Sequence, residues 1–266
     1  SLQSKVQSRL IPVNSSGLGA DYSAGLRKIY LQLAELFAKP ANAKQSKRYN
    51  ILGASPLHYR AESDICEIES LLREAFGYDL LHCFAMNTTT EAIAELGNAE
   101  LNIVLAAEAL PCAEYLQSVT GTPYVYLPPY GYSQTTEFLN SVAAVIGQPV
   151  KEAMLQRLAE KNRRLKMLLN SPLLSRTPGT VFLKGDYDTV KGLGDFFKEL
   201  RFNIAHSVCA HKITGAAAEA GIEYFKEEKE YLQLLKDIRH CLVMADEDII
   251  AKTDATNLKI CVSHPC

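Results

Sequence analysis

Histidine, arginine and acidic side chains occur in short polar loops that directly follow apolar segments of the sequence. His58 and Arg60 share the loop between residues 55 and 60, where histidine can transfer a proton and arginine can neutralise an anionic group. Glu108 follows a different apolar segment, and a carboxylate removed from water can act as an acid or a base. Loop residues of this kind are also common on ordinary protein surfaces, so both interpretations of His58 and Arg60 remain open.

Two further loops allow a structural and a functional interpretation. Thr88 begins a run of three threonines before Glu91, which is typical of a helix start because a threonine oxygen accepts from the free amides of the first turn. A cap is therefore favoured over an anion site. Residues 128–132, with two prolines and two tyrosines, are stiff and aromatic, and packing is favoured over a pocket.

Histidine and cysteine occur together in three places. Two of these are clusters: His206, Cys209 and His211, and then Cys261, His264 and Cys266. Neither cluster has the paired spacing of zinc ligands, and strand alternation sends His206 and Cys209 to opposite faces. His82 and Cys83 are strand neighbours that point apart, so Cys83 is predicted to be a buried thiol. We expect no metal ligands in this sequence.

Apolar, strand-like segments alternate with helix-like segments between residues 49 and 147. The predicted strands cover residues 49–52, 79–84, 101–106 and 124–127, and the predicted helices residues 61–76, 88–96, 110–119 and 134–146. Short, continuously apolar strands that alternate with helices indicate a parallel sheet covered on both faces. This region is therefore predicted to be a doubly wound α/β domain.

A second unit of the same kind is predicted after a long amphipathic helix at residues 151–169. Its strands are expected at residues 180–183, 203–208, 241–245 and 258–262, and its helices at residues 190–200, 224–236 and 246–253. The fold class is α/β, with two consecutive Rossmann-like doubly wound parallel-sheet domains joined by a long helix. Four parts are expected. Residues 1–47 are the end of a preceding domain with a connecting helix, and residues 48–148 are the middle α/β domain. Residues 149–178 are the connecting helix, and residues 179–266 are the second α/β domain, which is cut short.

Ligands of open α/β sheets bind beyond the carboxyl ends of the strands, where loop amides and helix N-termini converge. This rule selects five loops, at residues 53–60, 86–90, 106–111, 128–132 and 184–188. None of them contains a G-x-G-x-x-G fingerprint or a P-loop. The sequence therefore gives no support for binding of a dinucleotide or a nucleoside triphosphate.

Composition excludes several classes of protein. A net charge of -2 provides no basic field for nucleic acid. No uncharged apolar run reaches the roughly 18 residues of a membrane helix, and the N-terminal residues lack the pattern of an export signal, so a cytoplasmic location is expected. Seven scattered cysteines indicate reduced thiols rather than a disulfide framework.

Several short motifs occur in an order that is specific as a set. They are Ile11 to Gly19, Tyr49-Asn50-Ile51-Leu52-Gly53, Leu101-Asn102-Ile103-Val104, Gly121-Thr122-Pro123-Tyr124, Pro129-Tyr130-Gly131 and Thr135 to Leu139. With these motifs nearly the whole chain resembles the nitrogenase component 1 family. That family includes subunits of the molybdenum-iron protein, scaffolds that assemble metal cofactors, and reductases of tetrapyrrole rings.

The resemblance implies three similar α/β domains per subunit and subunits that pair as homo- or heterodimers. It also implies an iron-sulfur cluster held by cysteines of the first domain, and electrons from an ATP-dependent iron-protein partner. This sequence then begins at the end of the first domain, so the cluster is expected in the full-length protein and not in this piece, which alone is expected to be inactive. Ala106 stands where the nitrogenase catalytic subunit has a cysteine that ligates the metal cofactor, and alanine cannot coordinate iron.

The function implied by the resemblance is that of an oxidoreductase subunit that reduces a bound substrate. Arg60 or the helix start at Thr88 would neutralise an anionic substrate, and Glu108 would transfer a proton. Eight residues are predicted to face the cleft that binds the substrate. His58 and Glu108 are the catalytic candidates, and the pocket residues are Arg60, Asn87, Thr88, Ala106, Tyr130 and Asp186. Two alternatives stay open: a scaffold or carrier for cofactor assembly, and a catalytically empty subunit that pairs with an active one.

Overall fold

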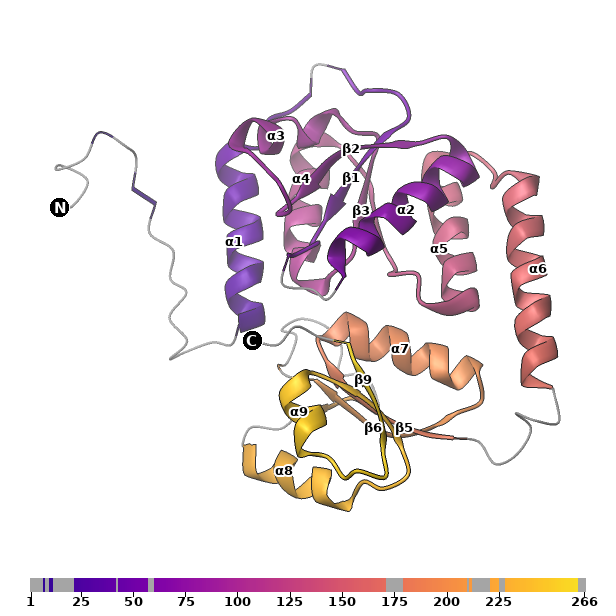
Figure 1. Ribbon diagram of the computed structural model, residues 1–266. Helices are drawn as coiled ribbons and strands as arrows, with labels where there is room; N and C mark the ends of the chain where they lie inside the picture. The colour runs from indigo at the N-terminus through magenta and orange to yellow at the C-terminus, as the bar shows by residue number, and fades with distance from the viewer. Residues whose placement is uncertain are drawn as a thin grey trace.

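The computed structural model describes residues 7, 10–11, 22–41, 43–56, 60–170, 179–209, 211, 221–224 and 228–262 of the 266-residue chain. Within these ranges it contains two parallel sheets with helices against their faces, one sheet above the other (Figure 1). The predicted α/β class with parallel sheets is confirmed. His58, the terminal His264 and Cys266, and most of the motif from Ile11 to Gly19 lie outside the described residues.

The first unit is built on a sheet in the order β2-β1-β3-β4, with every pair parallel. Its strands are β1 (Arg48–Leu52), β2 (Asp79–Phe84), β3 (Leu101–Val104) and β4 (Tyr124–Tyr126). Its helices are α1 (Tyr22–Phe37), α2 (Ala61–Phe76), α3 (Thr90–Ala94), α4 (Leu110–Thr120) and α5 (Gly131–Ile146), with short 3-10 turns η2 (Leu96–Asn98) and η3 (Ala107–Ala109).

Helices cover both faces of this first sheet, which explains why its strands are mostly apolar. Ile51 belongs to a core shared with α2 and α5, whereas its neighbour Leu52 belongs to a core shared with α1, α3 and α4. Adjacent strand residues point to opposite faces, so each must be apolar when helices cover both sides. Met154 and Leu158 of the long connecting helix α6 (Glu152–Leu169) complete the first of these cores.

The second unit has five parallel strands in the order β7-β6-β5-β8-β9. They are β5 (Thr180–Gly185), β6 (Asn203–Cys209), β7 (Glu223–Tyr224), β8 (Leu242–Ala245) and β9 (Leu258–Cys261). Helix α7 (Tyr187–Glu199) packs on one face against Val181 and Leu183, and α8 (Glu228–Asp237) and α9 (Glu247–Lys252) pack on the other against Phe182 and Val243.

Several predicted element boundaries differ from the structure. The helix predicted at residues 224–236 begins at Glu228, because Glu223 and Tyr224 pair with β6 as the short strand β7. The helix predicted to begin at residue 190 begins at Tyr187. The helix predicted at residues 88–96 is shorter, and Thr89 caps it by accepting a hydrogen bond from the Ala92 amide at 3.2 Å, which supports the structural interpretation of the threonine run.

The two units meet where α5 of the first lies beside α7 of the second (Figure 1). Gly192 on α7 leaves room for the ring of Tyr130, and a Cβ atom at this glycine would overlap that ring. Gly131, with φ +68°, is packed in the same way against the ring of Phe196. The loop between β4 and α5 is therefore fitted to the surface of α7, and this contact fixes the residues at the boundary between the units.

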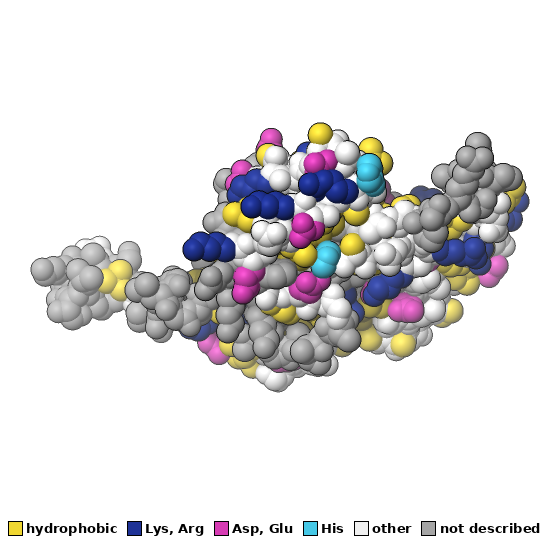
Figure 2. All heavy atoms as spheres, turned by 90° about the horizontal axis from the view of Figure 1, so that it is seen from below, with side chains coloured by type: hydrophobic (Ala, Val, Ile, Leu, Met, Phe, Trp, Pro, Cys, Tyr) yellow, Lys and Arg dark blue, Asp and Glu magenta, His cyan; other side chains and the backbone are white. Residues whose placement is uncertain are grey.

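The outer surface gives little sign of segregated charge. Seen from below, toward the second unit, basic and acidic side chains are intermixed with apolar ones over the part of the surface that is coloured (Figure 2). This matches the net charge of -2 in the sequence. No described helix is long and apolar enough to cross a membrane.

Candidate functional site

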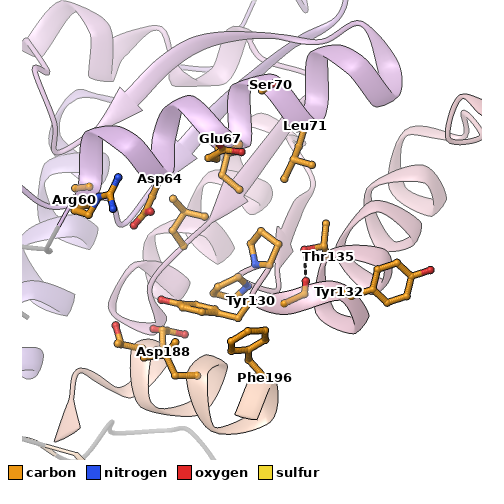
Figure 3. Close-up of a pocket in the computed structure, with 18 of the residues that line it drawn as sticks. Arg60, Asp64, Glu67, Ser70, Leu71, Tyr130, Tyr132, Thr135, Asp188 and Phe196 are labelled. Atoms are coloured by element: carbon orange, nitrogen blue, oxygen red, sulfur yellow. Dashed lines mark hydrogen bonds between the residues drawn. The ribbon is translucent and has the colours of Figure 1, made fainter. Parts of the chain in front are cut away.

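A cavity of about 680 Å³ lies beyond the carboxyl ends of β1, β3 and β4 and is closed from the other side by the second unit (Figure 3). Helices α2 and α6 form its walls, and Tyr130 and Phe196 lie next to each other at its floor. This is the position at which open α/β sheets bind ligands. Its volume is within the range of pockets for small organic molecules, roughly 300–1,000 Å³.

The cavity brings together most of the residues that the sequence selected. The predicted residues that line it are Arg60, Ala106, Glu108, Tyr130 and Asp186. Asn87 and Thr88 do not line it, because they follow β2, which is the edge strand farthest from β4. Thr88 instead donates to the Cys83 carbonyl at 2.6 Å and accepts from the Ala85 amide at 3.1 Å, so it holds a turn. The catalytic and binding roles of the lining residues stay predictions.

Glu108 lies at the boundary of the units with its carboxylate buried. Glu108 is 6% exposed. The Ser23 hydroxyl of α1 donates to Glu108 Oε1 at 2.8 Å, and His211 Nε2 lies 3.5 Å from the same oxygen. Burial by itself would raise the pKa of this carboxyl group, but the contacts with His211 and Ser23 outweigh it and hold the pKa below its usual range. Glu108 is therefore ionised despite its burial.

Asp188 reaches the same boundary from α7 of the second unit (Figure 3). Its carboxylate accepts from the Tyr126 hydroxyl at 2.6 Å and from the Ala107 amide at 2.8 Å. Burial raises the pKa of Asp188 to about 7, and the charges of Glu108 and Asp186 add to this effect, whereas the two hydrogen bonds oppose it. Asp188 of the second unit thus holds two parts of the first unit in place, the end of β4 at Tyr126 and the start of η3 at Ala107.

Sequence reasoning selected the loop at residues 184–188 but did not single out Asp188, it did not select Ser23, and it considered His211 only as a metal ligand. Both Asp188 and His211 follow strands of the second sheet, β5 and β6, at their carboxyl ends. The rule that selected the loop after β5 would also have selected the residues after β6. Ser23 carries no comparable signal, because it lies in the first turn of a helix that precedes the sheet.

The described cysteines do not fit an iron-sulfur cluster. Metal binding requires thiolates, and burial raises the pKa of Cys83 to about 11 and of Cys112 and Cys209 to about 12. Across the described ranges no group of three or more His, Cys, Asp or Glu side chains is placed to hold a metal ion. Ala106 presents only a methyl group to the cavity, and Cys112 is buried in the α4 core.

Comparison with known proteins shows the class to which the chain belongs. A model of the family described as nitrogenase component 1 type oxidoreductase matches residues 1–254, so this chain is a member of that oxidoreductase family. A solved structure of nitrogenase Cp1 at pH 6.5 has the same fold, with a TM-score of 0.69 over 92% of this chain and 59% of that one. The two are 17% identical in sequence, so this likeness concerns the fold alone.

Two curated relatives are more specific, and both are the B subunit of light-independent protochlorophyllide reductase. The subunit from Rhodopseudomonas palustris is 30% identical over 164 residues, which are 56% of this chain and 30% of that protein. The corresponding subunit from Cereibacter sphaeroides is 26% identical over 251 residues, which are 91% of this chain and 46% of that protein. The chain thus spans less than half the length of these relatives.

Proposed function

We propose that this chain is the substrate-binding part of a nitrogenase-like oxidoreductase subunit. In the intact assembly it pairs with a similar subunit and receives electrons that an ATP-dependent iron-protein partner supplies. The iron-sulfur cluster through which they pass is held by residues outside the described part of the chain. We further propose that residues 48–148 and 179–266 are its two domains, that residues 149–178 connect them, and that residues 1–47 link them to a preceding domain.

The cavity is the observation that carries this proposal. It lies where the fold predicts a ligand, and its lining combines a broad apolar surface with a few polar groups, including Arg60, Glu108 and Asp186. Ala106 offers no ligand for a metal cofactor that would hold a diatomic gas. We therefore infer a large, conjugated ring as the substrate, and the tetrapyrrole named in the relatives' descriptions belongs to that class.

Tyr130 and Phe196 suit a substrate of this kind. Their rings lie together at the floor of the cavity, and Leu71 faces them from α2 (Figure 3). Aromatic and aliphatic surfaces bind the face of a planar ring through apolar burial and offset stacking. Arg60, at the entrance to α2, is placed to contact an acidic substituent at the rim of such a ring.

Cavity-filling variants test the proposal in the full-length protein, purified with its partner subunit. Leu71→Phe adds a ring to the cavity and should weaken the binding of a magnesium tetrapyrrole at least tenfold, measured by fluorescence quenching. Val145→Phe adds the same ring at a position on α5 that is 39% exposed and outside the cavity lining, and it should bind normally. Unchanged binding in Leu71→Phe would place the ring elsewhere.

Reduction is measured on the same preparations with the iron-protein partner and ATP. Wild-type protein should reduce the ring, and Arg60→Ala should lower turnover without lowering the melting temperature. Tight binding of the ring without any reduction, in a complex whose partner subunit is active, would instead identify this chain as a catalytically empty subunit. A metal-sulfur cluster that leaves the protein for an acceptor would identify a carrier.

A further inference from the structure

A histidine-carboxylate pair is buried at the boundary between the two units, beside the cavity. Glu108 comes from η3 of the first unit, and His211 follows β6 of the second. Both side chains are 7% exposed, and His211 Nε2 lies 3.5 Å from Glu108 Oε1. Glu108 also lines the cavity, so one member of the pair can reach a bound molecule while the other lies behind it.

A second carboxylate connects this pair to the exterior. Asp186 Oδ1 lies 3.9 Å from His211 Nε2, and the Asp186 side chain is 39% exposed. The imidazole nitrogen therefore lies between a buried carboxylate and a partly exposed one. Two further titratable groups lie close to His211. The ring centroid of Tyr22 is 6.1 Å from that of His211, and the Cys209 thiol contacts the His211 backbone.

We propose that His211 and Glu108 form a proton relay that delivers protons to the substrate in the cavity, and that His211 regains its proton through Asp186, which lines the same cavity and is partly exposed. The relay rests on the proposed function, which supplies the substrate and, through the iron-protein partner, the electrons. Reduction of a double bond requires one proton for each electron, and a side chain that touches the bound substrate can supply these protons at the reacting atom.

The transfer is balanced within this set of groups. The resting pair holds one proton, shared as an imidazolium and a carboxylate. When the substrate has gained an electron, its basic carbon forms a C–H bond with a proton from Glu108, which in turn receives the proton from His211 Nε2. The pair is left as a neutral imidazole and a carboxylate. The Asp186 carboxylate then takes up a proton from solvent and passes it to Nε2, so both groups regain their starting charge before the next electron arrives.

The local geometry suits this role. Ser23 fixes the Glu108 carboxylate by a 2.8 Å hydrogen bond, so its position does not depend on His211. A separation of 3.5 Å is longer than a strong hydrogen bond, and catalytic contacts commonly shorten when substrate binds. Because the two members come from different units, the relay exists only when the units are held together as they are here.

A second pair of the same residue types provides a matched control. His206 Nδ1 lies 2.8 Å from Glu223 Oε1, between β6 and β7, and these side chains are 31% and 38% exposed. Neither residue lines the cavity. A general effect of removing a histidine beside a carboxylate should therefore appear equally at both pairs, whereas a relay involves only His211 and Glu108.

The test uses the full-length protein with its partner subunit and reductase. His211→Gln and Glu108→Gln should each lower kcat by about a hundredfold, the lower end of the range for general acid catalysis. The KM should stay within twofold, because neither change removes the binding surface. The double variant should be no slower than the slower single variant, since both changes interrupt the same transfer. His206→Gln should keep the wild-type kcat.

Two measurements separate the relay from a structural role and from the proposed function. Binding of the magnesium tetrapyrrole to His211→Gln, measured without the reductase, should equal that of wild type. The NMR signal of the His211 ring should move in Glu108→Gln and on addition of the ring compound, whereas the His206 signal should not move. Normal turnover in His211→Gln would overturn the relay and leave the proposed function intact, whereas failure of wild-type protein to bind the ring would overturn the proposed function.

Discussion

Glu108 and Asp188 are two carboxyl groups at the same boundary, one from each unit, and Glu108 is buried whereas Asp188 is partly buried. The pKa of Glu108 is held below its usual range, whereas the pKa of Asp188 is raised to about 7. Burial acts in the same direction on both groups, because it disfavours the charged form. The difference between them must therefore come from their partners.

The partners differ in charge rather than in number. Glu108 faces His211, which can carry a positive charge, and it also accepts from the Ser23 hydroxyl. Asp188 accepts from two neutral donors, the Tyr126 hydroxyl and the Ala107 amide, and has two acidic neighbours. A neighbouring cation can offset the rise in pKa that desolvation causes, whereas neutral donors only make this rise smaller. The same boundary thus contains one carboxyl group suited to staying charged and one that changes charge near neutral pH.

Removal of the His211 side chain should have the largest effect on this comparison. His211→Leu leaves the Glu108 carboxylate buried with Ser23 as its remaining hydrogen-bond donor, and should lower the free energy of unfolding by about 3 kcal/mol at pH 8. Glu108 should then behave as Asp188 does, so the loss should be smaller at pH 5, where the carboxyl group can take a proton. Urea denaturation at both pH values measures this.

The His206–Glu223 pair, which is more exposed than His211 and Glu108, supplies the control for that experiment. His206→Leu should cost less than about 1 kcal/mol at either pH, because solvent compensates the Glu223 carboxylate. Equal losses at the two histidines would contradict the view that His211 compensates a buried charge.

The pH dependence of stability should separate the two carboxyl groups. The pKa of Asp188 is about 7 in the folded protein, whereas the ordinary value of 3.8 applies to the unfolded chain. Between these two pH values the folded state therefore binds more protons than the unfolded state. Stability should therefore fall as the pH rises from about 4 to 7, with a slope of at most about 1.4 kcal/mol per pH unit, and this contribution should level off above pH 7. Glu108 has the opposite sign: its contribution is present above its usual pKa of 4.5 and is lost as the pH falls through its lowered value.

Asp188→Asn isolates this contribution. The variant should lose the slope between pH 5 and 7, while the loss of stability at lower pH, to which Glu108 contributes, should remain. Urea denaturation at unit intervals between pH 4 and 8 gives both quantities. An unchanged slope in Asp188→Asn would mean that another group titrates in this range.

The sequence predicted which loops lie at this boundary better than it predicted which side chains meet there. Parallel strands end at the same edge of a sheet, so the loops after β1, β3, β4 and β5 could be selected without coordinates, and this choice includes Glu108 and Asp186. Strand order was not predictable from the alternation of strands and helices. The loop with Asn87 and Thr88 was therefore included, although β2 is an edge strand.

The pairing of Glu108 with His211 could not be predicted at all. These residues belong to different units, and their approach depends on how the two units dock. Docking is fixed by the fit of Tyr130 to Gly192 and of Phe196 to Gly131, which is a property of surface shape and leaves no local pattern in the sequence. The short strand Glu223–Tyr224 was missed for a similar reason, because it is defined by its pairing with β6.

Removal of one neutral donor should have a moderate effect. Tyr126→Phe deletes the hydroxyl that donates to Asp188, and should cost about 1.5 kcal/mol at pH 8, where this carboxyl group is charged. At pH 5, where Asp188 is largely protonated, the cost should be smaller, and the pKa of Asp188 should rise further. Tyr124→Phe removes a hydroxyl from the same strand and serves as the control in urea denaturation. A cost that does not depend on pH would indicate that Tyr126 contributes through packing alone.

Removal of the neutral donor at Glu108 should have the smallest effect. Ser23 is 1% exposed, and Ser23→Ala deletes its hydrogen bond to the carboxylate, which should cost about 1 kcal/mol at pH 8. Because His211 remains, the pKa of Glu108 should rise only modestly and should stay well below that of Asp188. Ser118→Ala, at an exposed serine that bonds to its own helix, measures the cost of the mutation type. If Ser23→Ala destabilised the protein as much as His211→Leu, the number of donors rather than the charge of the partner would separate the two carboxyl groups.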